Sequence, residues 1–133
     1  MTTILVPISP GELIDKLTIL QLKADNIKDA GKQAHVLHEK AMLDAVVNQH
    51  VPASPELTAL WEKLFTINKS LWQIEDDIRA CDARGDFGPD YIALARAVYV
   101  TNDERAAVKK KINLLLGSSI VEEKSYYDAD GAA

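Results

Sequence analysis

Cysteine is nearly absent from this chain: Cys81 is the only one in 133 residues. An intrachain disulfide is therefore excluded. Because no obvious activating neighbour stands at helical spacing from Cys81, we interpret it as a structural thiol rather than a nucleophile. Long apolar runs are also missing, since no stretch approaches the roughly 20 residues that span a bilayer. Residues 2–6 lack the basic start of a signal peptide, so we expect no membrane insertion and a cytoplasmic location.

Positive charge is in deficit. Fifteen Lys and Arg against 20 Asp and Glu give a formal net charge of −5. This balance argues against nucleic acid or an anionic membrane as a partner. Histidine is scarce too, with three in the chain. His35, His38 and Glu39 have spacings that suit a metal ion, but such spacing is common on an exposed helix, and we predict no metal site.

Proline, glycine and serine divide the chain into helices. Ser9-Pro10-Gly11-Glu12 joins a serine N-cap to a proline at the first helical position and a glutamate three residues after the cap. This pattern predicts a capping box. We predict helices at about 10–29, 32–49, 55–83 and 89–116, and a short final helix at 120–126 begun by Ser119 and Glu122. Residues 1–9 are expected to form an extended arm packed on the helices, and residues 128–133 a frayed tail.

These elements predict an all-α fold in one helical domain over residues 1–133. Short connections favour antiparallel neighbours. We therefore expect an up-down helical bundle made of a short hairpin and a long antiparallel hairpin, the latter formed by residues 55–83 and 89–116.

Polar residues interrupt helix faces that should be apolar. The face that begins with Trp61 and Phe65 continues as Asn68, Trp72 and Glu75. The next long helix interrupts its apolar faces in the same way. Because buried charge is costly unless it is paired or used, the two helices predict a shared polar layer. The short turn between them predicts that Glu75 lies near Arg96 and Tyr99, Trp72 near Asn102, and Asn68 near Arg105.

This polar layer is the leading candidate site. The side chains that we expect to bind a ligand are Asn68, Trp72, Glu75, Arg79, Arg96, Tyr99, Asn102 and Arg105. The arginines would clamp a carboxylate or phosphate. Glu75, Asp76 and Asp103 are candidates for a catalytic base or for holding Mg²⁺, although no cofactor is otherwise indicated. The alternative is a self-satisfied ion-pair network that only fixes helix register.

The start of the first helix is a second candidate. Amides at a helix start can bind an anion, but Glu12 already occupies this one, which favours capping as its role. Asp15 and Lys16 are not needed for the cap, so their roles stay open.

Several segments together carry a family resemblance. They include the opening Ser-Pro-Gly-Glu-Leu-Ile-Asp-Lys-Leu-Thr-Ile-Leu of residues 9–20, Ile74-Glu75-Asp76, Asn102-Asp103 and residues 117–126. Nearly the whole chain resembles DUF6165, a bacterial family of short uncharacterised proteins. The resemblance implies no reaction. Because members are often encoded near surface-polysaccharide genes, it implies a link to surface-polysaccharide biosynthesis.

These observations favour a non-catalytic accessory protein that binds a small anionic ligand or a protein partner through the polar layer. One alternative is a small all-α enzyme, pyrophosphohydrolase-like or mutase-like, that acts on a phosphorylated or carboxylated metabolite. Another is a purely structural module that works through oligomerisation. The sequence leaves the ligand, the partner and homo-oligomer formation open.

Overall fold

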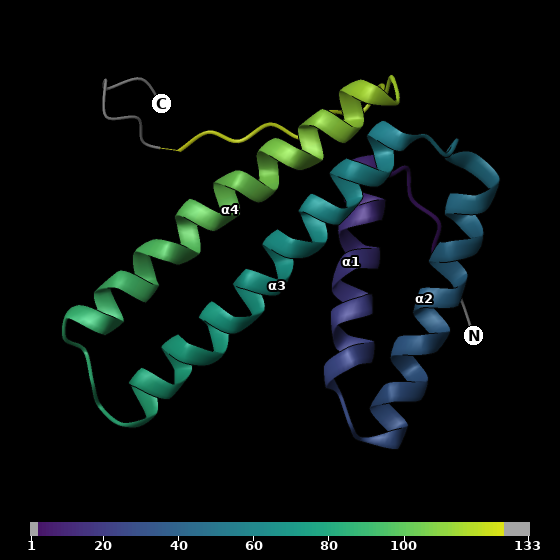
Figure 1. The fold of residues 1–133 in the computed structure, drawn as a ribbon. Helices are drawn as coiled ribbons and strands as arrows, with labels where there is room; N and C mark the ends of the chain where they lie inside the picture. Colours follow the sequence, from purple (N-terminus) through teal and green to yellow (C-terminus); the bar gives the residue numbers. More distant parts are fainter. Residues whose placement is uncertain (1–2, 127–133) are drawn as a thin grey trace.

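The computed structural model describes residues 3–126 and contains four helices in that range. They are α1 (Pro10–Asn26), α2 (Ala30–His50), α3 (Pro55–Ala83) and α4 (Pro89–Leu115). Figure 1 shows them as two hairpins, α1 with α2 and the longer α3 with α4. No strand occurs among the described residues. The predicted all-α fold with a long antiparallel hairpin is confirmed, while the tail at 128–133 lies outside the described residues.

Serine caps begin α1 and α3, as the Ser-Pro pairs predict. Ser9 Oγ accepts a hydrogen bond from the Glu12 amide at 3.2 Å, and Ser54 Oγ accepts one from the Leu57 amide at 3.1 Å. A proline occupies the first helical turn in each case. At α1 this is only half of the predicted capping box, because the Glu12 carboxylate binds Lys109 instead of returning to the cap.

One predicted helix boundary and one predicted helix are wrong. The first helix ends at Asn26 rather than near residue 29, because Asp29 is the N-cap of α2 and accepts from the Lys32 amide at 2.9 Å. The short final helix does not form, and residues 118–126 have no helical turn. The physical reason is that the Glu122 side chain, expected in a local cap, binds Lys109 of α4.

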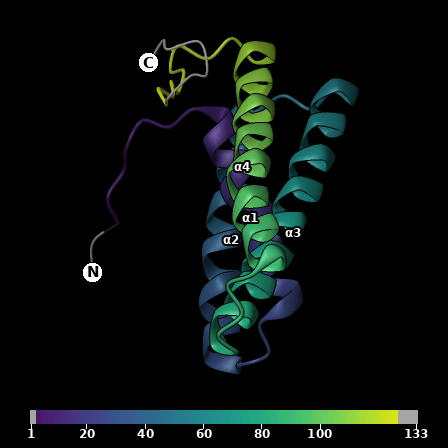
Figure 2. The ribbon, with the colours of Figure 1, turned by 90° about the vertical axis from the view of Figure 1, so that its left-hand side faces the viewer.

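The N-terminal arm also differs from its prediction. Residues 3–9 form neither helix nor strand, as predicted, but only Ile8 and Ser9 are packed, and residues 3–7 are exposed rather than packed on the helices. Ile4, Leu5 and Val6 are 80%, 89% and 67% exposed. Figure 2 shows this segment running away from the helices.

Helix α1 is the centre of the molecule: it contacts each of the other helices, whereas α2 contacts α1 alone. The main core cluster brings together α1, α3 and α4 through Ile14, Leu64 and Ile112, all fully buried. A second cluster joins Leu17 and Leu20 of α1 to Val36 of α2. Removing these apolar side chains from water is the main force that holds the helices together.

The α3–α4 hairpin is longer than the part that α1 covers. Beyond Leu71, the only buried residue of α3 is Cys81, and α4 has no buried residue before Val108. The Cys81 sulfur accepts a hydrogen bond from Arg84 at 3.1 Å, a neighbour that the sequence interpretation overlooked. Figure 1 shows the turn of the hairpin lying away from α1 and α2. The hairpin therefore ends in a two-helix extension. None of the described helices is both long and apolar enough to cross a membrane.

Candidate functional site

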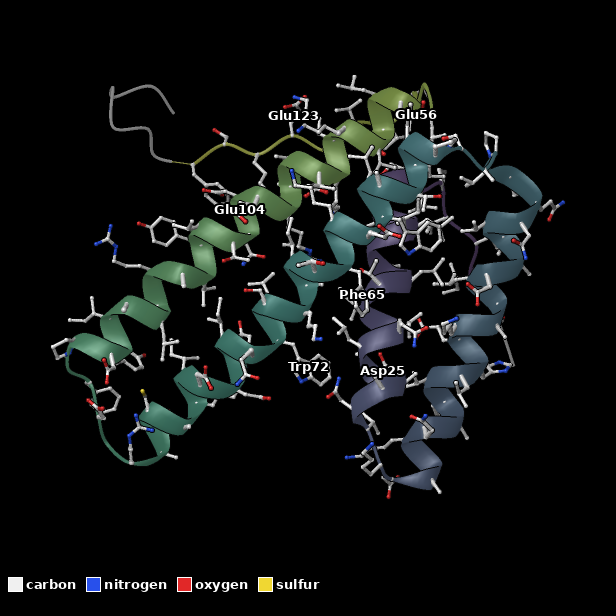
Figure 3. The ribbon with its side chains drawn as sticks, viewed as in Figure 1. Asp25, Glu56, Phe65, Trp72, Glu104 and Glu123 are labelled. Atoms are coloured by element: carbon white, nitrogen blue, oxygen red, sulfur yellow. The ribbon has the colours of Figure 1, made fainter. Side chains whose placement is uncertain are left out.

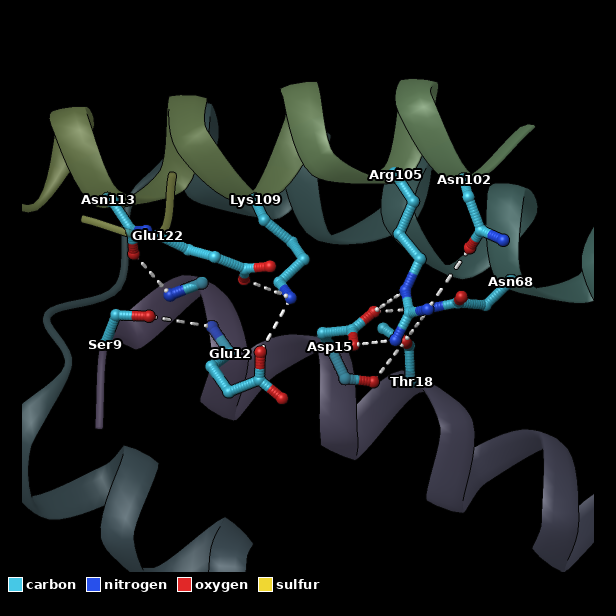
Figure 4. A network of polar contacts seen from close by, with 11 residues as sticks. Ser9, Glu12, Asp15, Thr18, Asn68, Asn102, Arg105, Lys109, Asn113 and Glu122 are labelled. Atoms are coloured by element: carbon cyan, nitrogen blue, oxygen red, sulfur yellow. Dashed lines mark hydrogen bonds and ion pairs between the residues drawn. The ribbon is translucent and has the colours of Figure 1, made fainter. Parts of the chain in front are cut away.

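A row of polar contacts joins α1 to α4 along their buried sides (Figure 4). We call this row the polar ladder. Its three pairs, in order along the helices, are Gly11–Asn113, Glu12–Lys109 and Asp15–Arg105. The α4 members are four residues apart, so each pair lies about one helical turn from the next.

Asp15 is the most deeply buried member of the ladder, with a side chain that is 1% exposed. Arg105 binds both of its carboxylate oxygens, and Nε donates to Oδ1 at 2.8 Å. Asn68 Nδ2 donates to the same Oδ1 at 2.9 Å and to Thr18 Oγ1 at 2.8 Å. The hydrogen bond to Asp15 raises the pKa of Arg105 despite partial burial. Asn68 and Arg105 therefore lie close together, as predicted, because both donate to the Asp15 carboxylate of α1.

Lys109 is the next member, and its side chain is 11% exposed. Its Nζ donates to Glu12 Oε2 at 2.6 Å and to Glu122 Oε2 at 2.9 Å. Burial acts to lower the pKa of Lys109, but the hydrogen bonds to these two carboxylates outweigh it and raise the pKa. In return, the hydrogen bond from Lys109 lowers the pKa of Glu122. Lys109 therefore attaches the segment after α4 to the ladder.

Gly11 allows the closest approach of the two helices. Its amide donates to Asn113 Oδ1 at 2.7 Å. A Cβ atom built on Gly11 would lie 2.5 Å from the Lys109 carbonyl oxygen and 2.8 Å from Asn113 Oδ1. Both distances are below van der Waals contact, so α1 and α4 reach this separation because the residue has no side chain.

The ladder ends at a groove where the hairpin leaves α1. We call it the junction groove, and its volume is about 410 Å³. It is lined by Ile19, Leu22, Asn68, Leu71, Trp72, Glu75, Asp76, Asn102 and Arg105. Figure 3 shows Trp72 projecting from α3 into the space beside α1. The volume falls within the range of small-molecule sites in proteins.

Asn68 leaves one hydrogen-bonding atom free at this groove. The residue is 4% exposed, and its amide nitrogen makes two hydrogen bonds. Among residues 3–126, no group donates to its side-chain oxygen Oδ1. Among the described residues, every fully enclosed side-chain oxygen or nitrogen atom has a hydrogen-bond partner except Gln33 Oε1. Asn68 Oδ1 has no partner and is not this exception, so it is not fully enclosed and solvent reaches it. The groove therefore contains a nearly buried acceptor that a bound molecule would satisfy.

The charges around the groove are mostly paired. Arg105 is bound to Asp15, and Arg79 binds Glu75 on the exposed face of α3. Asp76 is exposed and forms no ion pair with any described residue. The groove thus offers one unpaired carboxylate and no unpaired cation from the described chain.

The remaining predicted site residues lie elsewhere on α4. Arg96 is exposed and binds no described side chain. A second hollow, of about 700 Å³, is lined by Val98, Tyr99, Asn102, Asp103, Lys124 and Tyr126. Glu75, predicted to lie near Arg96 and Tyr99, pairs with Arg79 of its own helix, and no hydrogen bond or ion pair among the described residues joins it to Arg96 or Tyr99. Trp72 and Asn102 share the junction groove as predicted.

The ladder as a unit is not predicted from the sequence, which indicates only a separate cap at the start of α1. One signal could have found the ladder: the acidic Glu12 and Asp15 are opposite in sign to Arg105 and Lys109, and both pairs repeat at helical spacing. Within residues 3–126, no three His, Cys, Asp or Glu residues are placed to hold a metal ion.

Comparison with known proteins gives one match. A family model described as a family of unknown function, DUF6165, matches residues 4–131. No curated protein and no solved structure matches the chain. The matched range includes every residue of the polar ladder and of the junction groove.

Proposed function

Because this chain belongs to the DUF6165 family, whose description names no activity, we propose its function from the junction groove. The protein is a non-catalytic binding protein that holds a small polar ligand between α1, α3 and α4. The observation that carries the proposal is the unpartnered oxygen of Asn68, a residue that is 4% exposed and lines the groove.

Solvent reaches this oxygen, so a ligand that donates to Asn68 Oδ1 takes the place of water at a nearly buried residue. Asn68 is also held in one orientation, since both amide hydrogens are used by Asp15 and Thr18. A ligand that donates to Asn68 Oδ1 therefore meets a group that needs little reordering on binding. Such preorganisation favours affinity.

The arrangement of the acids supports binding rather than catalysis. Glu75 is engaged by Arg79, and Asp103 lines the other hollow. Asp76 is the remaining candidate base, and it is exposed. A catalytic base works best in a site that excludes water, close to a group that shares its task. The three candidate acids do not converge on one such place.

The ladder and the groove support two compatible roles. The ladder pairs its own charges, which is the arrangement expected of contacts that fix helix register. Asn68 and Arg105 belong to both features, so the register contacts also shape the groove. A register role for the ladder therefore does not compete with a binding role for the groove.

A ligand screen tests the proposal. Purified protein is mixed with amines, sugars, carboxylates, phosphates, nucleotides and Mg²⁺, and thermal unfolding is measured together with the NMR signals of the tryptophan indole N–H groups. A ligand at one hundred times its dissociation constant adds about 2.7 kcal/mol to the free energy of unfolding. We expect the Trp72 signal to move. The Trp61 signal should stay in place, because Trp61 packs against the core clusters and does not line the groove.

Matched variants locate the binding. Trp72→Leu should abolish the stabilisation, whereas Gln73→Ala, an exposed change on the same helix outside the groove, should leave it intact. If no compound moves Trp72 or raises the melting temperature, the small-ligand proposal is wrong. Capture of a protein partner by this face would then be the next experiment.

A further inference from the structure

We propose that the junction groove selects an organic cation, a primary ammonium or a guanidinium group on an apolar body. This inference rests on the proposed binding function and names the class of ligand. It departs from the anionic ligand expected from the arginines of the polar layer.

Two acceptor groups of the groove have no donor or counter-charge among the described residues. Asn68 contributes Oδ1, which has no donor among the described residues, and Asp76 contributes a carboxylate that forms no ion pair with them. An ammonium group has three donors and no acceptor, and a guanidinium has five donors. Either group can satisfy Asn68 and Asp76 together, whereas a carboxylate or phosphate ligand has no hydrogen to donate to them.

The net charge of the groove also favours a cationic ligand. Asp15 cancels Arg105, and Glu75 cancels Arg79. Asp76 is left, so the groove carries a net negative charge among the residues that line it and their partners. An anion in the groove would find the charge of Arg105 already neutralised by Asp15 and would be repelled by the Asp76 carboxylate. A cation gains attraction to Asp76 without breaking either pair.

The walls of the groove accommodate the rest of such a ligand. Ile19, Leu22 and Leu71 provide apolar surface, and Trp72 provides an indole. An indole ring attracts a cation through the negative face of its π system. The volume of about 410 Å³ accommodates a ligand with a ring and a short chain. Together these features favour a cation that carries an apolar body over a bare metal ion or an inorganic cation.

Three probes of one shape separate the effect of charge from that of shape. Benzylamine, benzyl alcohol and benzoate share a ring and differ in being cationic, neutral and anionic. Each is titrated up to tens of millimolar while the Trp72 indole signal is followed, with Trp61 as the internal reference. We expect benzylamine to bind most tightly, benzyl alcohol next and benzoate least. Raising the salt concentration should weaken only the binding of benzylamine.

A matched pair of variants tests the role of Asp76. Asp76→Asn removes the unpaired charge of the groove, while Asp82→Asn removes an exposed carboxylate from the same helix outside it. Because Asp76 is exposed, we expect its loss to weaken benzylamine about three-fold to five-fold, the range of a solvent-exposed ion pair. Asp82→Asn should leave benzylamine binding unchanged, and neither variant should change the binding of benzyl alcohol.

The possible results distinguish this inference from the binding function. Equal binding of all three probes, or tightest binding of benzoate, at Trp72 overturns the cation inference and leaves a binding groove in place. The cation inference is also overturned, and the binding groove stays in place, if the Trp72 signal responds to other compounds of the screen but to none of the three probes. If nothing in either experiment moves Trp72, the binding function itself is wrong.

Discussion

Asp15 is a carboxylate with almost no solvent contact, and residues from two other helices bind it. Arg105 of α4 supplies charge and Asn68 of α3 supplies a further hydrogen bond. Ion pairs of this kind add little net stability over an apolar replacement, but they are sensitive to the loss of one partner. Asp15 therefore specifies how α1 sits between α3 and α4 more than it strengthens the fold.

Arg105→Ala should lower the free energy of unfolding by about 3–5 kcal/mol, because it leaves the buried Asp15 carboxylate without its positively charged partner. Arg105→Lys should cost less, since lysine keeps the charge but loses the planar fork that binds both oxygens. Urea unfolding followed by circular dichroism measures both changes. A loss below about 1 kcal/mol for Arg105→Ala would show that Asp15 is not held as described.

Gly11→Ala should destabilise the protein by about 1–3 kcal/mol, the usual cost of forcing atoms into a packed region. The added methyl group would lie 2.5 Å from the Lys109 carbonyl oxygen, so α1 and α4 must move apart. Gly31→Ala is the matched control, because a Cβ there meets only the Asp29 side chain at 3.4 Å. The control should be neutral or slightly stabilising, and equal losses in the two variants would refute the close-approach role of Gly11.

At the scale of helices, local sequence chemistry predicts most boundaries. The Ser-Pro pairs at residues 9–10 and 54–55 begin α1 and α3 as expected, because an N-cap and a first-turn proline act within a few residues. The final helix fails for the opposite reason. Its capping residue, Glu122, binds a lysine 13 residues earlier, and a local pattern contains no information about that contact.

The difference between local and long-range contacts also explains which part of the site could be predicted from the sequence. The short turn of the α3–α4 hairpin limits its register, so Asn68 was correctly placed near Arg105. The ladder instead joins residues 90 to 102 positions apart, such as Asp15 with Arg105 and Gly11 with Asn113. No periodicity within one helix reports how α1 is rotated against α4. The rotation follows from packing of the whole core.

The segment after α4 should detach in acid. The pKa of Glu122 lies below its ordinary value of 4.5, so the contact with Lys109 contributes stability above that pH and loses it as the pH falls through the lowered pKa. The raised pKa of Lys109 keeps the contact intact at neutral pH. Hydrogen exchange of residues 118–126 between pH 7 and pH 3, corrected for the intrinsic rate, measures the release.

Glu122→Gln is the control for this release. The variant should show weak protection of the segment at both pH values, because the charge that binds Lys109 is absent. The energy involved is small, since the Glu122 side chain is 48% exposed. An unchanged pH dependence in Glu122→Gln would assign the release to another group.

At the scale of the whole molecule, burial is uneven along the α3–α4 hairpin. The part beside α1 carries the main core, and the extension toward the turn has Cys81 as its one buried residue on α3. A segment with few buried apolar contacts opens more readily than the core. The junction groove lies at the boundary between these two parts.

Native-state hydrogen exchange should show this boundary. We expect the amides of residues 74–98 to exchange faster than those of 57–71 and 105–113, after correction for intrinsic rates. The measurement is made on the wild-type protein by mass spectrometry or NMR. Uniform protection along both helices would show that the extension is covered in solution, for example by a second copy of the chain.

The central position of α1 has a consequence for the order of folding during synthesis. This helix leaves the ribosome before any of its partners, yet its last partner on α4, Asn113, lies 102 residues further along the chain. Until α4 has been made, the Asp15 carboxylate lacks its guanidinium, and the apolar face of α1 has only α2 and α3 to cover it. Contacts between such distant residues slow folding, and transiently exposed apolar surface invites aggregation. The nascent protein therefore cannot complete its core one helix at a time, because α1 is synthesised first and its contacts with α4 form last.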